Sequence, residues 1–323
     1  MREAIARAEV GDDSLGQDPT TARLESVIAE LLGHEASVFF PSGTMANEVA
    51  MQLLCPPGTE AVVEAHSHFV DWELGAPAAL SGVQLKQVAT PDGLLTPELV
   101  EAAIRLPMRY QLQTSAIFVE NTYGAAGGKV LPLEQQRAIL EVARRRSLPV
   151  HLDGARLWNA AAATGYTEAE LAAGVDTVMV SLSKGLGCPV GSMLAGSRDL
   201  MEKARWVRRR LGGAMRQNGI LAAAGLYAIE HHRARLVEDH ERARELGRRA
   251  AEVPGVSVIP PETNMVMIDL PDGREAFAVL QQLQERGVLL TPMTATRIRA
   301  VLHLDVGDED IVKAAAALAE VLS

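Results

Sequence analysis

The chain has 323 residues, of which 48% are hydrophobic, 22% charged and only 4% aromatic. This composition is ordinary for a globular enzyme and excludes a disordered or fibrous chain. The 41 acidic residues outnumber the 31 basic ones, which gives a net charge of −10. Because no basic block interrupts this acidic balance, binding to nucleic acid or to an anionic membrane is not expected, and an anionic ligand needs a local site.

Cysteine content and hydropathy indicate the cellular compartment and exclude some classes of protein. The two cysteines, Cys55 and Cys188, are too few for a disulfide framework or a cysteine-rich zinc site, and we assign no metal ligands. The first residues are charged and amphipathic, without the apolar run of a signal peptide. No stretch approaches the ~20 apolar residues that span a membrane, so we expect a cytoplasmic protein.

The first part of the chain alternates short apolar runs with helical patterns. The first helix is predicted to start at Asp18-Pro19, an N-cap followed by proline, and to end at Gly33. An apolar run over 36–40 then meets a glycine turn, 41–44, where a second helical pattern begins. Further strands are expected at 60–64, 115–120, 148–153 and 177–181, with helical segments such as 132–146 between them. This alternation predicts an α/β fold with a mostly parallel central sheet flanked by helices.

The pattern changes after the glycine pair at 212–213. A long helical region is expected over 219–252, with Arg/Glu pairs at helical spacing. Beyond it we expect strands within 256–270 and 288–303, and helices at 274–286 and 308–322. The sequence therefore predicts a large domain, residues 1–240, connected by a long helix to a smaller C-terminal α/β domain, residues 241–323.

Two predicted strand ends carry residues suited to ligand binding, and ligands of open parallel sheets bind at the carboxyl ends of the strands. Ser42, Gly43 and Thr44 begin a helix, whose free backbone N–H groups and dipole favour a phosphate. The same residues also form ordinary N-cap turns. Asp153 ends an apolar strand, where a carboxylate needs a cation or a protonated ring nitrogen, and the nearby Arg156 is the simple alternative partner.

A third strand end carries Lys184, one of only five lysines among the 31 basic residues, in a segment rich in serine and glycine. Most lysines near strand ends are solvated, but a lysine in a sparsely charged pocket can act as an amine nucleophile toward a carbonyl. A phosphate site, a carboxylate for a ring nitrogen and a reactive amine are together what pyridoxal 5′-phosphate (PLP) requires. The sequence therefore predicts a PLP enzyme.

Eight short motifs follow one another along the chain: GDD at 11–13, PSGTMAN at 41–47, ENT at 120–122, DGAR at 153–156, SLSKG at 181–185, GGAMRQ at 212–217, TNM at 263–265 and HLDV at 303–306. This ordered set resembles the low-specificity L-threonine aldolase family over essentially the whole chain. The resemblance implies PLP fold type I and a homotetramer, a dimer of dimers with shared active sites. It also implies an aldehyde-lyase that cleaves L-threonine, L-allo-threonine or related β-hydroxy-α-amino acids to glycine and an aldehyde.

The resemblance assigns the cofactor contacts residue by residue. Lys184 would bind the cofactor covalently, and Asp153 would keep its pyridine nitrogen protonated. Backbone N–H groups around Ser42, Gly43 and Thr44 would hold the phosphate.

The resemblance likewise assigns the substrate contacts. His68 takes the place of the ring-stacking histidine, with His66 as its nearest competitor, and is our candidate for the base that removes the β-hydroxyl proton. Arg156 and Arg299 would clamp the amino-acid carboxylate, because a guanidinium can contact it with two hydrogen bonds. Arg216 would reach the cofactor phosphate, in a neighbouring subunit.

Tyr123 departs from the family pattern, which commonly has histidine after Glu-Asn-Thr. A phenol is a much weaker base at neutral pH. Tyr123 is therefore a candidate catalytic residue for which we favour a role in shaping the side-chain pocket. Members of the family commonly have further N-terminal residues, which we also expect in the native chain. Two alternatives stay open: β-elimination or racemisation on the same cofactor, with Lys184 as the base at Cα, and a PLP-binding protein without turnover.

Overall fold

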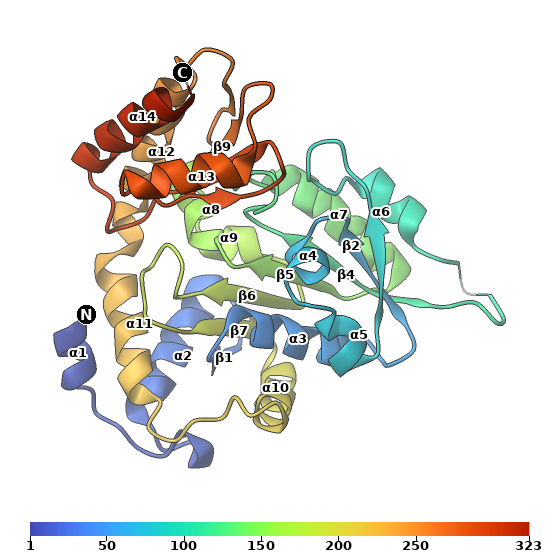
Figure 1. Ribbon diagram of the computed structural model, residues 1–323. Helices are drawn as coiled ribbons and strands as arrows, with labels where there is room; N and C mark the ends of the chain where they lie inside the picture. The colour runs from blue at the N-terminus through green and yellow to red at the C-terminus, as the bar shows by residue number, and fades with distance from the viewer. Residues whose placement is uncertain (107, 323) are drawn as a thin grey trace.

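A seven-stranded, mostly parallel sheet forms the centre of the protein, as the computed structural model shows for residues 1–106 and 108–322 (Figure 1). Its strands are β1 (Ala36–Phe40), β2 (Glu60–Glu64), β3 (Gln84–Val88), β4 (Thr114–Glu120), β5 (Val150–Gly154), β6 (Thr177–Ser181) and β7 (Ser192–Gly196). In space they follow the order β1-β7-β6-β5-β4-β2-β3. Every residue of β2, β5, β6 and β7 is buried, which is typical of a sheet covered on both faces.

Strand direction decides which residues can meet at one edge of this sheet. The five strands that lie side by side as β3, β2, β4, β5 and β6 pair in parallel, whereas β7 runs antiparallel to both β6 and β1. Strand β1 therefore points the same way as β6. The carboxyl ends of β1, β2, β4, β5 and β6 consequently lie along one edge, which is the expected place for a ligand.

Helices cover the large sheet. They are α1 (Arg2–Ala6), α2 (Pro19–Leu32), α3 (Gly43–Leu54), α4 (His68–Asp71), α5 (Ala76–Ser81), α6 (Pro97–Ala103), α7 (Leu133–Arg146), α8 (Leu157–Thr164), α9 (Glu168–Ala172), α10 (Arg198–Arg210) and α11 (Gly219–His231). Of these, α2, α3 and α7 lie where the sequence predicts helical segments. The predicted ends of α2 are confirmed, since Asp18 accepts a hydrogen bond from Thr21 N at 2.8 Å and Gly33 has a φ of 68°. Among the described residues no helix is long and apolar enough to cross a membrane.

The C-terminal part forms a smaller antiparallel sheet in the order β10-β11-β9-β8, packed against helices (Figure 1). Its elements are α12 (Leu236–Ala250), β8 (Ser257–Ile259), β9 (Met265–Asp269), α13 (Ala276–Glu285), β10 (Thr291–Pro292), β11 (Arg297–Val301) and α14 (Asp308–Leu322). The hydrophobic core changes within α12, because Leu236 packs in the large core and Ala243 in the small one. The predicted boundary between residues 240 and 241 falls in this stretch and stays a prediction.

The long helix expected over 219–252 is interrupted. Helix α11 ends at His231, a single 3₁₀ turn covers Arg233–Arg235, and α12 starts at Leu236. At the interruption His232 Nδ1 lies 2.7 Å from the carbonyl oxygen of Leu186 and forms a hydrogen bond with it. A contact from the chain just after Lys184 thus fixes the point where the two helices meet.

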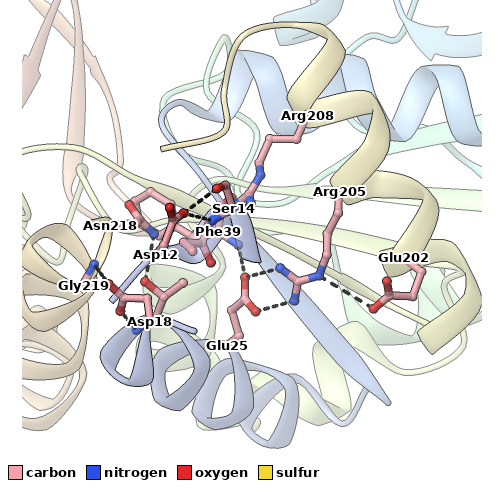
Figure 2. A network of polar contacts seen from close by, with 12 residues as sticks. Asp12, Ser14, Asp18, Glu25, Phe39, Glu202, Arg205, Arg208, Asn218 and Gly219 are labelled. Atoms are coloured by element: carbon pink, nitrogen blue, oxygen red, sulfur yellow. Dashed lines mark hydrogen bonds and ion pairs between the residues drawn. The ribbon is translucent and has the colours of Figure 1, made fainter. Parts of the chain in front are cut away.

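A network of buried polar contacts ties the N-terminal segment to the large body (Figure 2). Arg208 of α10, which is 4% exposed, lies 2.9 Å from the carboxylate of Asp13 and donates to the carbonyl oxygen of Phe39 at 2.7 Å. Asp18 accepts from the backbone N–H groups of Gly11, Thr21 and Gly219. Since Phe39 lies near the end of β1, this network fixes the chain directly before the 41–44 turn.

Candidate active site

A cavity of about 200 Å³ lies at the edge where the carboxyl ends of the parallel strands meet. Four of its lining side chains, His68, Glu120, Arg156 and Lys184, follow or end β2, β4, β5 and β6. Arg299, from β11 of the small sheet, closes the other side. The cavity therefore unites residues predicted from separate motifs, and both parts of the chain contribute to it.

Lys184 is poised as a nucleophile. Among the described residues its amine has neither an ion-pair partner nor a side-chain hydrogen bond. Burial and the positive charge of Arg156 lower the pKa of Lys184, although Asp153 and Glu120 act in the opposite direction. A lowered pKa increases the fraction of neutral amine, the form that attacks a carbonyl carbon. The predicted role of Lys184 thus has a suitable environment.

Arg156 and Arg299 form a site for an anion. Burial and the neighbouring charge of Arg299 lower the pKa of Arg156 to about 10, and burial lowers the pKa of Arg299. Within the described chain neither guanidinium has an ion-pair partner, and Nε of Arg299 is buried without an acceptor. Two neighbouring cations that are partly removed from water repel each other, and a carboxylate or phosphate between them would offset this cost. The pair therefore fits the carboxylate of an amino acid.

Asp153 fits a protonated ring nitrogen. Its carboxylate is held by the N–H of Ala155 at 3.0 Å and by the side-chain amide of Asn47 at 2.9 Å, in a residue only 2% exposed. The alternative pairing with Arg156 is not formed in the part of the chain that the structure describes. A buried carboxylate without a cation matches the partner that the pyridine ring of PLP requires.

The two histidines of the 64–69 segment occupy different environments. His68 Nδ1 lies 2.8 Å from Glu73 Oε1, and burial lowers its pKa while the hydrogen bond to Glu73 and the charge of Asp153 raise it, with a net rise. The side chain of His66 is 71% exposed and contacts Asp71 at 3.2 Å. His68 is thus the less exposed histidine, and its hydrogen bond to Glu73 fixes its orientation, in keeping with the predicted stacking and proton-transfer role, while His66 lies at the rim.

The turn at Ser42 can hold a phosphate. Ser42 caps α3 by accepting from Met45 N at 3.2 Å, which leaves the first N–H groups, those of Gly43 and Thr44, without intrahelical acceptors. A Cβ on Gly43 would meet Ser192 Oγ at 3.4 Å, and this buried hydroxyl has no hydrogen-bond partner among the residues that the structure describes. Small size at Gly43 and an unpartnered hydroxyl beside it fit a ligand with many oxygens.

Tyr123 and Arg216 lie outside this cavity. The hydroxyl of Tyr123 donates to Glu64, and its ring lines a neighbouring cavity of about 1040 Å³. Burial and the adjacent Glu64 raise the pKa of Tyr123 far above its ordinary value. The side chain of Arg216 is 71% exposed and pairs with Asp12 at 2.5 Å. Its contact with a phosphate in a neighbouring subunit stays a prediction.

Three polar residues, of which Asn47 and Glu73 are buried and Glu120 is partly buried, complete the site and were not predicted as site residues. Asn47 lies between Asp153 and Glu73 and donates to both. Glu120 accepts from the N–H groups of His68 and Gly124, and burial together with the charge of Asp153 raises its pKa to about 7. Asn47 and Glu120 belong to two of the family motifs, PSGTMAN and ENT, and could have been found there. The sequence around Glu73 contains no motif that would identify it as a site residue.

His68, Glu73 and Asp153 also deserve a test as metal ligands, since their ligand atoms lie within 4.8 Å of one another. His68 and Glu73 are already joined by a hydrogen bond, and the amide of Asn47 donates to both carboxylates. This is the geometry of a hydrogen-bonded cluster, in which His68 Nδ1 and the Asn47 amide already occupy Glu73 Oε1 and the Asn47 amide occupies one oxygen of Asp153.

Comparison with known proteins places the chain in a family. Residues 1–272 match the family model described as beta-eliminating lyase. The chain belongs to this family. It is 40% identical to low-specificity L-threonine aldolase 1 of Arabidopsis thaliana, over 96% of this chain and 89% of the relative. The identity is also 40% to the low specificity L-threonine aldolase of Escherichia coli K12, over 98% of this chain and 93% of the relative.

The chain is also similar in structure to a solved protein of the threonine aldolase group. A protein from Listeria monocytogenes classed as an L-allo-threonine aldolase superposes with a TM-score of 0.84 at 26% identity, over 99% of this chain and 92% of the other. These likenesses confirm the predicted resemblance and the predicted fold, PLP fold type I with a mostly parallel central sheet. They support the predicted lyase chemistry and cofactor class, and do not test the individual site residues.

Proposed function

We propose that this beta-eliminating lyase family member is a PLP-dependent aldehyde-lyase of the threonine aldolase type. It cleaves L-threonine, L-allo-threonine or related β-hydroxy-α-amino acids to glycine and an aldehyde. The observation that carries this proposal is one cavity lined by Lys184, Arg156 and Arg299, none of which has an ion-pair partner among the described residues. An amine for a carbonyl and cations for a carboxylate are what an amino-acid enzyme of this cofactor class requires.

The residues present fit the cofactor at each end. Lys184 would bind it covalently, Asp153 would hold a proton on its ring nitrogen, and the N–H groups of Gly43 and Thr44, with Ser42 as their cap, would bind its phosphate. When bound, PLP supplies an electron sink that stabilises negative charge at Cα of the amino acid.

The protein then orients the substrate and moves one proton. Arg156 and Arg299 bind the α-carboxylate and fix the rotation about the bonds to Cα. His68 faces the same cavity and accepts the proton of the β-hydroxyl group through Nε2, because its Nδ1 is engaged by Glu73. Tyr123, held by Glu64, shapes the larger neighbouring cavity, which shares the lining residues His66, Ala125 and Met265 with the first.

Assembly and location are part of the same proposal. We place the protein in the cytoplasm as a homotetramer, a dimer of dimers whose subunits share active sites. The side chain of Arg216 supports this arrangement, since it is 71% exposed and in the described chain pairs only with Asp12, so it is free to reach a neighbouring subunit.

The deciding experiment incubates PLP-loaded protein with threonine, allo-threonine and serine and measures glycine, pyruvate and the inverted amino acid. Glycine from the two threonines, absent in Lys184→Ala, supports the proposal. Pyruvate or an inverted amino acid as the main product identifies β-elimination or racemisation, and a yellow protein with no product is a binding protein without turnover. A chain extended at its N-terminus, assayed in parallel, tests the contribution of earlier residues.

A further inference from the structure

Two buried acids lie directly behind His68. Glu73 has no exposed side-chain surface, and Glu48 of α3 is 1% exposed. Glu73 Oε1 lies 2.8 Å from His68 Nδ1 and 2.9 Å from Asn47 Nδ2. By contrast, Glu73 Oε2 and Glu48 Oε1 are buried oxygens that receive no hydrogen from any donor in the described chain.

Glu48 and Glu73, which we term the carboxyl pair, are two neighbouring buried acids. Burial and the adjacent charge of Glu73 raise the pKa of Glu48 to about 8. Two negative charges in one buried site repel each other, which favours a proton on Glu48 at neutral pH. A proton on Glu48 Oε1, donated to Glu73 Oε2, satisfies both oxygens that otherwise lack a partner. Ser81 donates to the other oxygen of Glu48 at 3.2 Å.

The donors around the carboxyl pair favour the negative charge on Glu73, because Asn47 and His68 both face Glu73, whereas Glu48 receives only the Ser81 hydroxyl in the described chain. Burial lowers the pKa of His151 to about 4, so this histidine is neutral, and its Nε2 lies 3.2 Å from Asn47 Oδ1 while its Nδ1 contacts the Thr177 hydroxyl. Because Asn47 Oδ1 is an acceptor only, His151 Nε2 carries hydrogen and donates to it. The amide nitrogen of Asn47 points away from His151 and donates to Glu73 and Asp153.

We propose that Glu73 is a positioning residue that, as the ionised member of the carboxyl pair, fixes His68 in the tautomer with its proton on Nδ1 and Nε2 free. An ionised Glu73 can only accept hydrogen bonds, so the nitrogen that faces it must carry hydrogen. The other ring nitrogen of neutral His68 is then an acceptor at all times. The tautomer is a property of the chain itself, and only its use as a base rests on the proposed function.

Charged groups on several elements act on His68. Glu73 and Asp153 favour the protonated ring, Lys184 disfavours it, and Glu120 accepts from the backbone N–H of His68. Removal of the Glu73 charge leaves the other three in place. The pKa of His68 should therefore fall in a Glu73→Gln variant by about one unit or more, the usual effect of a hydrogen-bonded neighbouring charge.

The test is nitrogen NMR on the cofactor-free protein with ¹⁵N-labelled histidine, in which His68→Phe identifies the His68 signals. Glu73→Gln and Glu48→Gln are matched variants, because both remove a buried carboxyl group without changing its shape. Glu48→Gln replaces a neutral acid by a neutral amide, so it should leave the His68 tautomer and pKa nearly unchanged, whereas Glu73→Gln should lower the pKa. In the loaded enzyme the acidic limb of kcat against pH should move to lower pH in Glu73→Gln.

Three outcomes would overturn the proposal. In the unsubstituted protein, a neutral His68 with its proton on Nε2 refutes it whether or not the variants fold. In folded variants, an equal pKa change in Glu48→Gln and Glu73→Gln would place the charge on Glu48, and an unchanged pKa in Glu73→Gln would show no effect of Glu73. Since these measurements need neither cofactor nor substrate, absent aldolase activity with the expected tautomer would refute only the proposed function.

Discussion

Replacement of Tyr123 by phenylalanine separates a catalytic role for this residue from a structural one. Its buried hydroxyl donates to Glu64, and its pKa is raised by burial and by that carboxylate, so it stays protonated at neutral and moderately alkaline pH. A protonated phenol cannot accept the β-hydroxyl proton. We therefore expect kcat of Tyr123→Phe to stay within about tenfold of the parent value, below the ~10²–10⁴-fold contribution of a general base.

The same substitution should lower stability by an amount that follows from the contacts of Glu64. A hydrogen bond to a charged group contributes about 1.5–3 kcal/mol. Glu64 keeps two donors in Tyr123→Phe, the N–H of His66 and the hydroxyl of Thr90, so we expect the lower end, about 1.5 kcal/mol. At about 2–4 °C per kcal/mol for a chain of this size class, Tm should fall by about 3–6 °C.

The assay is kcat against pH for the parent, Tyr123→Phe and His68→Phe, with thermal unfolding measured on the same samples. His68→Phe should lose at least ~10²-fold in kcat near neutral pH, since it removes the proposed base. A loss of that size in Tyr123→Phe at parental Tm, beside an active His68→Phe enzyme, would refute the assignment and make Tyr123 the base.

Three further predictions follow from single contacts. Borohydride reduction of the loaded protein should attach the cofactor to Lys184 and to no peptide of Lys184→Ala; label on Lys203 would contradict this. Arg299→Lys keeps the charge but loses the two-pronged contact, so KM for threonine should rise about 10-fold or more with kcat nearly constant, whereas an unchanged KM would exclude a substrate contact. Asp13→Ala should lower the free energy of unfolding in urea by about 3 kcal/mol, because it leaves Arg208 buried without its carboxylate; a change below about 1 kcal/mol would contradict it.

Strands with continuous apolar runs could be predicted from the sequence, and those with other patterns could not. The runs that became β1, β2 and β6 are confirmed at their predicted residues. Strand β3 was missed because its exposed edge position allows the polar alternation of Gln84–Val88. Strand β7 was missed because Ser192–Gly196 is short and follows a glycine-rich turn, and its antiparallel direction depends on pairing with β6 and β1 rather than on composition.

The site divides in the same way. Asp153 and Lys184 follow apolar strands directly, so the chemistry of an unusual residue at a strand end identifies them. Glu73 could not be predicted, because its role depends on contacts with Asn47 and His68 that come from α3 and the start of α4. Such a contact is set by how the helices pack over the sheet, and no spacing in the sequence encodes it.

Helix α12 makes the two parts of the protein thermodynamically dependent on each other. Its first turn packs in the large core through Leu236, its later turns pack in the small core, and it contacts α8 on one side and α14 and β9 on the other. Unfolding of either core would remove part of the packing that stabilises α12. Arg299 in the small sheet and Lys184 at the end of β6 should therefore lose their mutual arrangement in one cooperative step, so that heating yields no long-lived form with half an active site.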